Sequence, residues 1–530
     1  MWGSGWRERV WSALDRPWDL IIIGGGITGA GILREAARVG LQGLLVEADD
    51  FAAGTSSRSG KLVHGGLRYL SNGQIKLTRD SVRERERLLR EGRGLVNPLG
   101  ELMVSFQGDH IPEWVFGVGF IIYDLLAFKW GHQHYSPAGL RDLCPQLTED
   151  GLTGGYRFFD AQTDDARLVL RLLREAVQDG AVALNYARVD SLLRSQSGAV
   201  AGVVLQDTSS DGSGRTAEVK APVVISATGA WADDLRAHIR AAPRLRRLRG
   251  SHLYLPFNRL PLTRAVTLLH PDDGRPVYVF PWEGAIIAGT TDIDHGPGAE
   301  IDPAISQPEA EYLMAFLQRT FPAQGITFAD VISTQAGVRS VVDTGKADPS
   351  KESREHVLWE EAGLLTVTGG KLTTFRLMAH DALRRARARL PGHPALHARQ
   401  RVLDQPPPER CLGSQVDPAH CTRFLGRYGA EAPDLLAAAQ PGETERIGDS
   451  LASWAELRWA ARAEGVVHLD DLLLRRVRLG LVLPEGGIPW IDRIRSTVQT
   501  ELGWSDQRWQ QEVAAYTRLW KTCYYLPRAG

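Results

Sequence analysis

A segment near the N-terminus, TSSRSGKLVHGGLRYL at residues 55–70, concentrates side chains that can do chemistry. It offers four hydroxyls before Gly60, followed by Lys61, His64, two adjacent glycines, Arg68 and Tyr69. A histidine can accept a proton near neutral pH, and glycines let a ligand approach the backbone closely. Apolar residues are too sparse for a core segment, so we expect this segment to line a ligand site.

The elements in front of this segment are those of a nucleotide-binding fold. DLIII at residues 19–23 predicts a short buried strand, and residues 27–39 predict a helix that ends at Gly40. LLVE at residues 44–47 predicts the next strand. Strand, helix and strand in this order predict a βαβ unit that opens a doubly wound sheet of an α/β protein.

The turn after the first strand carries Gly24, Gly26 and Gly29 in the spacing G-x-G-x-x-G. These glycines let the backbone approach a pyrophosphate, and the helix N-terminus supplies unpaired N–H groups. Glu47, at the end of the second strand, can accept hydrogen bonds from ribose hydroxyls and would repel a 2′-phosphate. The unit therefore predicts a site for NAD or FAD.

A second glycine turn favours FAD. LLTVTGGKLTTF at residues 364–375 predicts a strand, a turn at Gly369 and Gly370, and a helix that continues to residue 386. A helix N-terminus aimed at a flavin would stabilise negative charge on the reduced ring, whereas a nicotinamide needs no such site. Residues 278–294 predict two further strands joined by a turn at Glu283 and Gly284.

Eight motifs follow one another along the chain: GGGITGAG, TSSRSGKLVHGGLRYL, TDDARLV, ATGAW, GSHLYLP, GTTDID, GVR and GGKLTTFR. Together they resemble the FAD-dependent glycerol-3-phosphate dehydrogenase family of aerobic, quinone-linked enzymes from about residue 19 to 376, and more loosely around residues 468–481. The resemblance implies a D-amino-acid-oxidase-like FAD-binding Rossmann domain, an antiparallel-sheet substrate domain (α+β) and a helical C-terminal domain. It also implies a peripheral membrane location and electron delivery to a quinone.

On this basis we divide the chain into four parts. Residues 1–18 form an N-terminal helix, and residues 19–95, 155–235 and 335–395 form a discontinuous FAD-binding domain. Residues 96–154 and 236–334 form the substrate-binding or cap domain. Residues 396–530, which include a proline-rich connector, form the helical C-terminal domain.

We expect the FAD contacts to come from both glycine turns and from the segment between them. The hydroxyls of residues 55–57 would donate hydrogen bonds to the pyrophosphate or to polar atoms of the flavin ring. The predicted FAD-binding residues are Gly24, Gly26, Gly29, Glu47, Thr55, Ser56, Ser57, Lys61, Val189, Ala227, Gly229, Gly337, Gly370, Leu372 and Thr373.

The family's active-site cations correspond to Arg68, Arg339 and Lys371, and Tyr69 would add a hydroxyl. Three converging cations are costly without an anion, and the phosphate of glycerol 3-phosphate supplies one. The predicted chemistry is transfer of a hydride from C2 to FAD while a base takes the hydroxyl proton. His64 and His252 are the candidates for the base, His64 lying in the denser motif, and Arg339 would polarise the substrate oxygens. No metal is predicted.

Bulk composition excludes several classes of protein. The 62 basic and 63 acidic residues of the 530-residue chain nearly balance, which favours neither nucleic acid nor an acidic partner. Four scattered cysteines form no CxxC pair, which argues against a zinc site and for a reducing, cytoplasmic environment. No segment reaches the ~18 apolar residues of a membrane-spanning helix, and there is no apolar signal region. Together with the peripheral location that the family resemblance implies, this predicts a cytoplasmic protein on the inner face of the membrane.

Three surface features bear on an anionic membrane surface as a partner. Trp2, Trp6, Val10 and Leu14 predict a helix that either lies in the membrane interface or docks on its own domain. Two basic runs, at residues 76–90 and 236–249, are either solvated faces with interleaved acids or contacts to lipid headgroups. No motif places a quinone site, so the large apolar side chains of residues 112–128 are its default candidates.

Four interpretations stay open. The first is a membrane-surface dehydrogenase, and the second is a soluble α-glycerophosphate oxidase that uses oxygen and shares nearly all of these motifs. An amine or amino-acid oxidase of the same fold would need one carboxylate-binding arginine rather than three cations. A flavoprotein without catalytic activity is disfavoured by the intact His64, Arg68, Arg339 and Lys371. A homodimer is left open.

Overall fold

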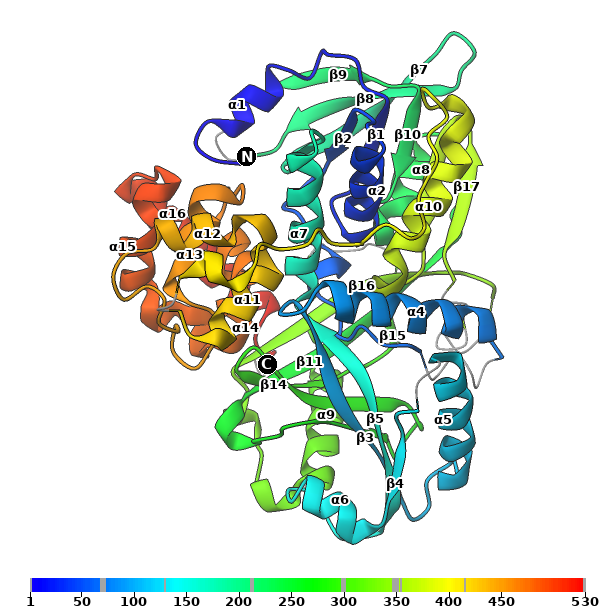
Figure 1. Cartoon of the computed structure of the whole chain (residues 1–530), viewed down its shortest axis with the longest axis vertical. Coiled ribbons are helices and arrows are strands. Elements are labelled where there is room, and N and C mark those ends of the chain that lie inside the picture. Colours follow the sequence, from blue (N-terminus) through cyan, green and yellow to red (C-terminus); the bar gives the residue numbers. More distant parts are fainter. Residues whose placement is uncertain are drawn as a thin grey trace.

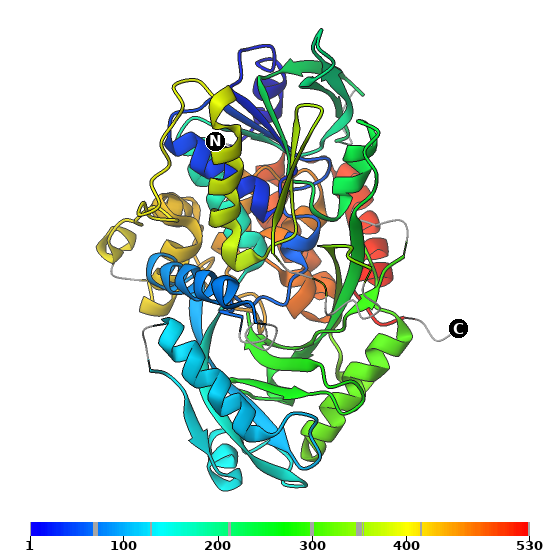
Figure 2. The same cartoon turned by 90° about the vertical axis from the view of Figure 1, so that its right-hand side faces the viewer.

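The computed structural model describes residues 2–66, 73–127, 130–209, 214–296, 302–345, 352, 355–413 and 416–527. Figures 1 and 2 show three regions. An α/β region stands at the top, a large sheet lies below it, and a group of helices flanks both on the left of Figure 1.

The α/β region is built on a sheet with the strand order β17–β18–β10–β1–β2–β6. Its strands are β1 (Leu20–Ile23), β2 (Gly43–Val46), β6 (Val182–Leu184), β10 (Val223–Ser226), β17 (Val357–Glu361) and β18 (Leu364–Thr368). Neighbours in this sheet run parallel, apart from β17 against β18. Each residue of β1, β2 and β10 is buried, which explains why these strands are continuous apolar runs. The βαβ unit predicted from the sequence is confirmed.

Helices cover one face of this sheet, and a small antiparallel sheet covers the other. Helix α2 (Ile27–Arg38) packs between α7 (Asp165–Gln178) and α10 (Phe375–Ala386) (Figure 1). The small sheet consists of β7 (Ala187–Arg194), β8 (Val200–Asp207) and β9 (Thr216–Lys220), and β8 packs on β10. The short helix α8 (Ala232–Ala237) follows β10. The carboxyl ends of β1, β2 and β10 are left open to ligands, as is usual in such folds.

The large sheet has the order β15–β11–β14–β13–β12–β3–β5–β4, with β16 also paired to β11. It comprises β3 (Val96–Phe106), β4 (Gln133–Tyr135), β5 (Leu152–Thr163), β11 (Leu245–Pro256), β12 (Ala265–Leu269), β13 (Pro276–Trp282), β14 (Ala285–Gly289), β15 (Ile293–Asp294) and β16 (Ser333–Val342). The sheet is antiparallel except where β12 runs parallel to β3. The predicted turn at Glu283 and Gly284 joins β13 to β14, as expected.

The helices around this sheet include α4 (Ile75–Glu91), α5 (Glu113–Ala127), α6 (Pro137–Leu143) and α9 (Gln307–Thr320). Helix α4 separates the α/β region from the large sheet, and α5 lies along the outer side of the sheet (Figures 1 and 2). Hydrogen bonds from Arg85 of α4 reach Tyr123 of α5 and Asp160 of β5. These buried polar contacts tie the two helices to the sheet.

The C-terminal region is helical, as predicted. It contains α11 (Pro418–Tyr428), α12 (Ala432–Ala438), α13 (Trp454–Ala463), a π-helix (Asp471–Arg476), α14 (Leu479–Val482), α15 (Ile491–Leu502) and α16 (Asp506–Cys523). Buried arginines join it to the rest of the molecule: Arg167 of α7 pairs with Glu464, and Arg476 of the π-helix pairs with Asp50.

The N-terminal segment docks on its own protein. Helix α1 spans only Trp6–Trp11, shorter than the helix predicted for residues 1–18. Trp2, Trp6 and Leu14 are buried, and the Trp2 ring stacks on Phe51 with 4.8 Å between centroids. The alternative of a membrane anchor at this end is therefore wrong, because the apolar side chains that it needs are part of the core.

The second basic run is a set of ion pairs. Arg236 pairs with Asp233 and Glu361, and other arginines of the run pair with acids nearby: Arg246 with Asp294, Arg247 with Asp234 and Arg249 with Glu309. This favours the interpretation as a solvated face. In the first run, Lys76, Arg79 and Arg83 are exposed on α4.

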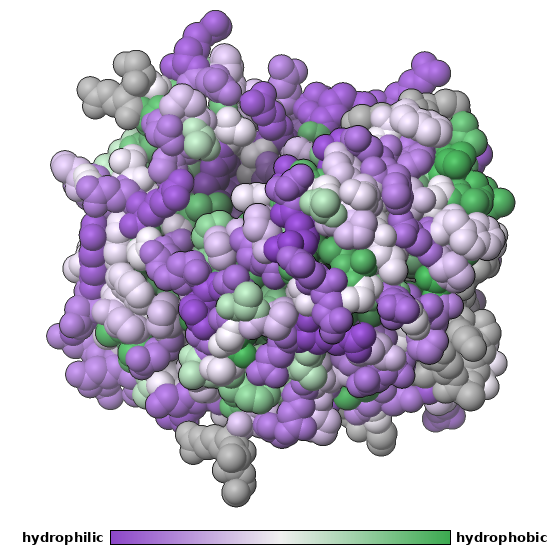
Figure 3. All heavy atoms as spheres, turned by 90° about the horizontal axis from the view of Figure 1, so that it is seen from below, coloured by the Kyte–Doolittle hydropathy of each residue, from purple (hydrophilic) through white to green (hydrophobic). Residues whose placement is uncertain are grey.

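Over the parts of the chain that the structure describes, no helix combines the length and the apolar composition that crossing a bilayer requires. The surface nevertheless carries apolar side chains in a cluster. Figure 3 shows such a cluster at the right-hand edge of the molecule seen from below, the side on which Figure 1 places α5.

Candidate functional site

A cavity of about 600 Å³ lies at the carboxyl ends of the parallel strands, against the large sheet. Four groups of predicted site residues line it: Gly24, Gly26 and Glu47 after β1 and β2; Thr55, Ser56 and His64 from the segment at residues 55–66; Val189, Ala227 and Gly229; and His252, Gly337, Arg339, Gly370, Lys371, Leu372 and Thr373. A cavity of this size is in the range of cofactor sites. Residues that are far apart in the sequence thus face one space.

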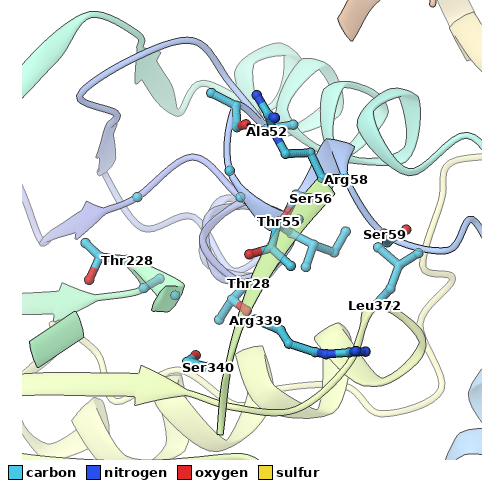
Figure 4. A pocket seen from close by; sticks show the side chains of 18 of the residues that line it. Thr28, Ala52, Thr55, Ser56, Arg58, Ser59, Thr228, Arg339, Ser340 and Leu372 are labelled. Carbon is cyan, nitrogen blue, oxygen red and sulfur yellow. Dashed lines mark hydrogen bonds between the residues drawn. The ribbon is translucent and has the colours of Figure 1, made fainter. Parts of the chain in front are cut away.

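The N-terminus of α2 opens into this cavity. A Cβ atom at Gly24 would lie 2.6 Å from the carbonyl oxygen of Ala227, and one at Gly26 would lie 2.9 Å from the Ser56 hydroxyl. The Ile27 amide donates to the Ser56 hydroxyl across 2.9 Å. The absence of side chains leaves backbone N–H groups accessible at a helix end, which is a site for a pyrophosphate. Figure 4 shows Thr28 and Ser56 at this end of the pocket.

Glu47 is held at the end of β2 by backbone amides. Its two oxygens accept hydrogen bonds from Gly25 N at 2.6 Å and Asp49 N at 3.0 Å. Burial, and then the charge of Asp49, raise the pKa of Glu47 to about 7. Each carboxylate oxygen has a second lone pair, so Glu47 can still accept a ribose hydroxyl.

The second glycine turn leads into a helical segment beside the cavity. Gly369 and Gly370 both have φ of 73°, which side chains rarely tolerate. The turn delivers Leu372 and Thr373 to the cavity wall, where the 3₁₀ turn Leu372–Thr374 runs into α10. The Thr373 hydroxyl donates to the His64 carbonyl at 3.3 Å, which joins this turn to the segment at residues 55–66.

Two of the predicted cations reach the cavity from different elements. On β16, Arg339 Nη2 donates to Asp292 Oδ1 at 2.9 Å and to the Thr291 carbonyl at 3.0 Å. Lys371 Nζ donates to Ser81 Oγ of α4 at 3.1 Å. Figure 4 shows the Arg339 side chain extending from β16 toward the side of Leu372. Arg68 and Tyr69, the other predicted phosphate ligands, lie outside the described residues.

Both candidate bases line the cavity. His252 on β11 is buried, and its Nδ1 has no hydrogen-bond partner within the described structure. Burial, and then the charges of Lys61 and Arg339, lower the pKa of His252 to about 3. His252 is therefore neutral at physiological pH and a weak base. Its ring packs against Gly289, where a Cβ atom would collide with it.

Three predicted FAD-binding residues lie behind the cavity wall instead of on it: Gly29, Ser57 and Lys61. Lys61 Nζ donates to Asp165 at 2.8 Å and to the Ser57 carbonyl at 2.6 Å, and burial lowers the pKa of Lys61 to about 7. Arg478 from the C-terminal region donates to the same carbonyl at 2.6 Å. A Cβ at Gly29 would overlap the Gly24 carbonyl, so this glycine serves the close packing of α2. Their direct contact with FAD stays a prediction.

Several cavity residues were not singled out from the sequence. Tyr278 and Phe280 of β13 both line the cavity wall. Side chains alternate between the two faces of a strand, so their spacing of two residues could have indicated that they share one face. Behind the wall, Asp292 of the GTTDID motif accepts a hydrogen bond from Arg339. Gly250 faces the Arg339 guanidinium, since a Cβ there would lie 3.0 Å from Nη2.

These features fit FAD. The glycine cradle, which is Gly24 and Gly26 at the N-terminus of α2, would hold the pyrophosphate, and Glu47 would bind the ribose. The turn at Gly370, with Leu372 and Thr373, would contact the flavin. His252 Nδ1, buried and without a hydrogen-bond partner among the described residues, is the kind of polar atom that a bound group satisfies.

Comparison with known proteins gives the same result. The sequence profile of the DAO family, FAD dependent oxidoreductase, matches residues 19–406, and that of the C-terminal domain of alpha-glycerophosphate oxidase matches residues 379–509. Glycerol-3-phosphate dehydrogenase 2 of Mycobacterium tuberculosis is 33% identical over 545 residues, 97% of this chain and 92% of the relative. Aerobic glycerol-3-phosphate dehydrogenase of Staphylococcus saprophyticus is 31% identical and covers 89% of this chain and 88% of its own. The crystal structure of the glycerol-3-phosphate dehydrogenase from Bacillus halodurans complexed with FAD superposes with a TM-score of 0.77 at 26% identity, covering 98% of each chain.

Proposed function

Because the chain belongs to the FAD-dependent glycerol-3-phosphate dehydrogenase family, we propose that it oxidises sn-glycerol 3-phosphate to dihydroxyacetone phosphate and passes the electrons to a membrane quinone. One observation supports the substrate best. Arg339 and Lys371, separate in the sequence, line the cavity that also contains the glycine cradle and both histidines. A pocket with two cations suits a substrate that carries a phosphate.

Arg339 and Lys371 would bind and orient the phosphate, with Arg68 and Tyr69 as further proposed ligands. A guanidinium binds phosphate oxygens through two parallel N–H groups, so Arg339 would also fix the angle of the substrate. Asp292 holds the Arg339 side chain in place at 2.9 Å. When bound, FAD supplies the two-electron acceptor that takes the hydride from C2.

A histidine would take the proton from the C2 hydroxyl. We propose His64, because the pKa of His252 is lowered to about 3 by burial and a group with so low a pKa is a weak base near neutral pH. Neutral His252 can still orient the hydroxyl by a hydrogen bond. His64→Gln should then slow reduction by substrate more than His252→Gln does; the reverse order would make His252 the base.

Two electron acceptors are compatible with the relatives of this chain. A relative named aerobic glycerol-3-phosphate dehydrogenase supports a respiratory acceptor, and the match to the C-terminal domain of alpha-glycerophosphate oxidase keeps oxygen as the alternative. With quinone as the acceptor, the protein would work on the cytoplasmic face of the membrane as a peripheral protein.

The test is an anaerobic visible spectrum of the purified holoenzyme before and after glycerol 3-phosphate is added. Bleaching of the flavin band is expected. A yellow protein that does not bleach would refute the substrate. Reoxidation is then followed after addition of either a short-chain quinone or air. Fast return of colour with quinone and slow return in air supports the dehydrogenase, and fast return in air with release of peroxide would make the protein an oxidase.

A further inference from the structure

Helix α5 presents an apolar stripe to solvent. Its exposed large side chains are Trp114, Val115, Val118, Ile121, Ile122 and Leu125. The spacing i, i+1, i+4, i+7, i+8, i+11 places all six on one side of a helix. Trp114 is 68% exposed and Leu125 is 63% exposed. A helix on the surface of a globular protein normally turns a polar face to water, so this stripe is unusual.

The opposite side of α5 is already packed. Phe120 is fully buried and packs on Phe158, while Tyr123 bonds to Arg85. The acidic residues of the helix also have partners away from the stripe. Glu113 contacts His134, and Asp124 accepts hydrogen bonds from Gly131 N at 2.8 Å and His132 Nδ1 at 2.7 Å. The exposed stripe therefore carries no charge.

We propose that the α5 stripe is the surface by which this protein docks on a lipid bilayer. The inference rests on the proposed delivery of electrons to a membrane quinone and names the contact that this delivery needs. The occupant would be the boundary between lipid headgroups and acyl chains, with α5 lying parallel to the membrane plane.

Aromatic residues at both ends of the stripe favour lipid over a protein partner. Trp114 begins the stripe, and Trp130, also 68% exposed, follows the end of the helix. Tryptophan is enriched at the level of lipid headgroups, where its ring is buried and its N–H stays wet.

The size of the stripe argues against a second copy of the chain. From Trp114 to Leu125 a helix rises about 17 Å, and with a width of about 10 Å the footprint is about 170 Å². A stable protein interface buries about 800 Å² on each partner. Insertion into a bilayer has no such minimum, because each apolar side chain contributes separately.

Exposed cations lie beside the stripe. Helix α4, which bonds to α5 through Arg85 and Tyr123, carries exposed Lys76, Arg79 and Arg83 at helical spacing on one face. Figures 1 and 2 place α4 next to α5 on the outer surface of the molecule. Anionic headgroups would attract these side chains while the apolar stripe enters the bilayer.

The experiment is flotation of the holoenzyme with vesicles of phosphatidylglycerol and phosphatidylcholine in equal amounts, compared with vesicles of phosphatidylcholine alone. The wild type should float with both and more strongly with the anionic vesicles. The double variant Ile121→Ser/Ile122→Ser should bind at least about tenfold more weakly, because two buried aliphatic side chains are lost. The matched double variant Ile121→Leu/Ile122→Leu keeps the apolar area and should bind like the wild type.

A second control removes an exposed apolar side chain outside α5. Phe257, directly after β11, is 41% exposed, and Phe257→Ser should leave vesicle binding unchanged. All variants should retain FAD and their melting temperature, because the exchanged side chains point into solvent. Binding of the serine double variant at wild-type strength would overturn the proposal. Failure of the wild type to float with either kind of vesicle would also overturn it. A third contradicting outcome is a wild-type dimer that becomes monomeric in the serine double variant while vesicle binding stays unchanged.

The same wild-type sample is also reduced with glycerol 3-phosphate in the absence of lipid. If substrate bleaches the flavin but no vesicles are bound, the docking surface is wrong and the enzymatic function stands. If vesicles are bound but substrate does not bleach the flavin, the docking surface stands and the proposed function fails.

Discussion

At the scale of single residues, charge and burial decide what the cavity can do. Arg339 is held by Asp292 and the Thr291 carbonyl, so its guanidinium is oriented before substrate arrives. Such preorganisation lowers the entropic cost of binding an anion. His252 is kept neutral by burial and by neighbouring cations, which suits a hydrogen-bonding role.

Arg339→Ala should lower kcat/KM for glycerol 3-phosphate by at least about tenfold, since a hydrogen bond to a charged group contributes about 1.5–3 kcal/mol. The FAD content should not change. Steady-state kinetics with a water-soluble acceptor measures this. Arg246→Ala, on the same sheet but paired with exposed Asp294, is the control and should have normal kinetics. Near-normal kcat/KM for Arg339→Ala would remove this residue from the phosphate site.

Glu101 of β3 gives a prediction for pH. Burial, and then the charge of Asp160, raise the pKa of Glu101 to about 8 from an ordinary value of 4.5. Between these values the folded protein binds more protons than the unfolded chain, so stability falls as pH rises through this range. Glu101→Gln removes the titration while keeping the acceptor for the Thr267 hydroxyl.

The melting temperature of Glu101→Gln relative to wild type should therefore increase from pH 5 to pH 8, by the equivalent of at least about 1 kcal/mol. Thermal melts at several pH values measure it. Glu445→Gln, at an exposed position, should show no such trend. A constant difference for Glu101→Gln would mean that Glu101 titrates normally.

At the scale of elements, the ends of helices and strands form the site. Helix α2 begins at the cavity because three glycines leave room there, and Ser56 accepts from its first amide. Helix α5 is linked to the same site: Tyr123 and Arg85 contact Asp160, and Asp160 accepts a hydrogen bond from Gly65 N, beside His64, at 3.0 Å. Through Asp160, helix α5, which presents the apolar stripe to solvent, is therefore connected to the loop that carries His64.

Ser56→Ala should cost about 1 kcal/mol of stability and also weaken FAD retention severalfold, because the Ile27 amide loses its acceptor at the proposed pyrophosphate site. Ser136→Ala is a matched control. Ser136 accepts from Gly139 N at the start of α6, at 3.3 Å, away from the cavity. It should cost similar stability without loss of FAD. Equal FAD retention in the two variants would separate Ser56 from the cofactor site.

At the scale of the whole molecule, buried ion pairs hold the C-terminal helices on the α/β region. Arg167 of α7 bonds to both oxygens of Glu464, and Asp50 bonds to Arg475 and Arg476. Through Arg478 the same region supports the Ser57 carbonyl behind the cavity. The C-terminal region therefore stabilises the loop that carries the predicted base.

Arg167→Met should destabilise the protein by about 3–5 kcal/mol, because Glu464 is left buried without its bidentate partner. The double variant Arg167→Met/Glu464→Met should recover much of this loss. Unfolding in urea, followed by fluorescence and by FAD release, measures the cycle. Arg495→Met, which breaks an exposed pair with Asp506, should change little. Additive effects of the two methionine substitutions would mean that the pair is not coupled.

The sequence by itself determined the local features of this protein. The βαβ unit around Gly24, the turn at Glu283, the strand–turn–helix at Gly369 and the helical C-terminal region depend on glycine placement and on the spacing of apolar residues, which act over short stretches of chain. The family resemblance was also visible in the sequence, because it rests on short motifs whose residues match those of the family.

Only the tertiary structure decided how distant segments meet. The sequence could not show that Lys61, a predicted FAD-binding residue, pairs with Asp165 behind the cavity wall. Nor could it show that the N-terminal tryptophans, which are compatible with a membrane interface, pack on Phe51 and the core. Both faces of α5 are apolar, so periodicity could not show which face is buried. Ion pairs such as Lys61–Asp165 and Arg167–Glu464 depend on packing between residues more than a hundred positions apart, and no local pattern encodes that packing.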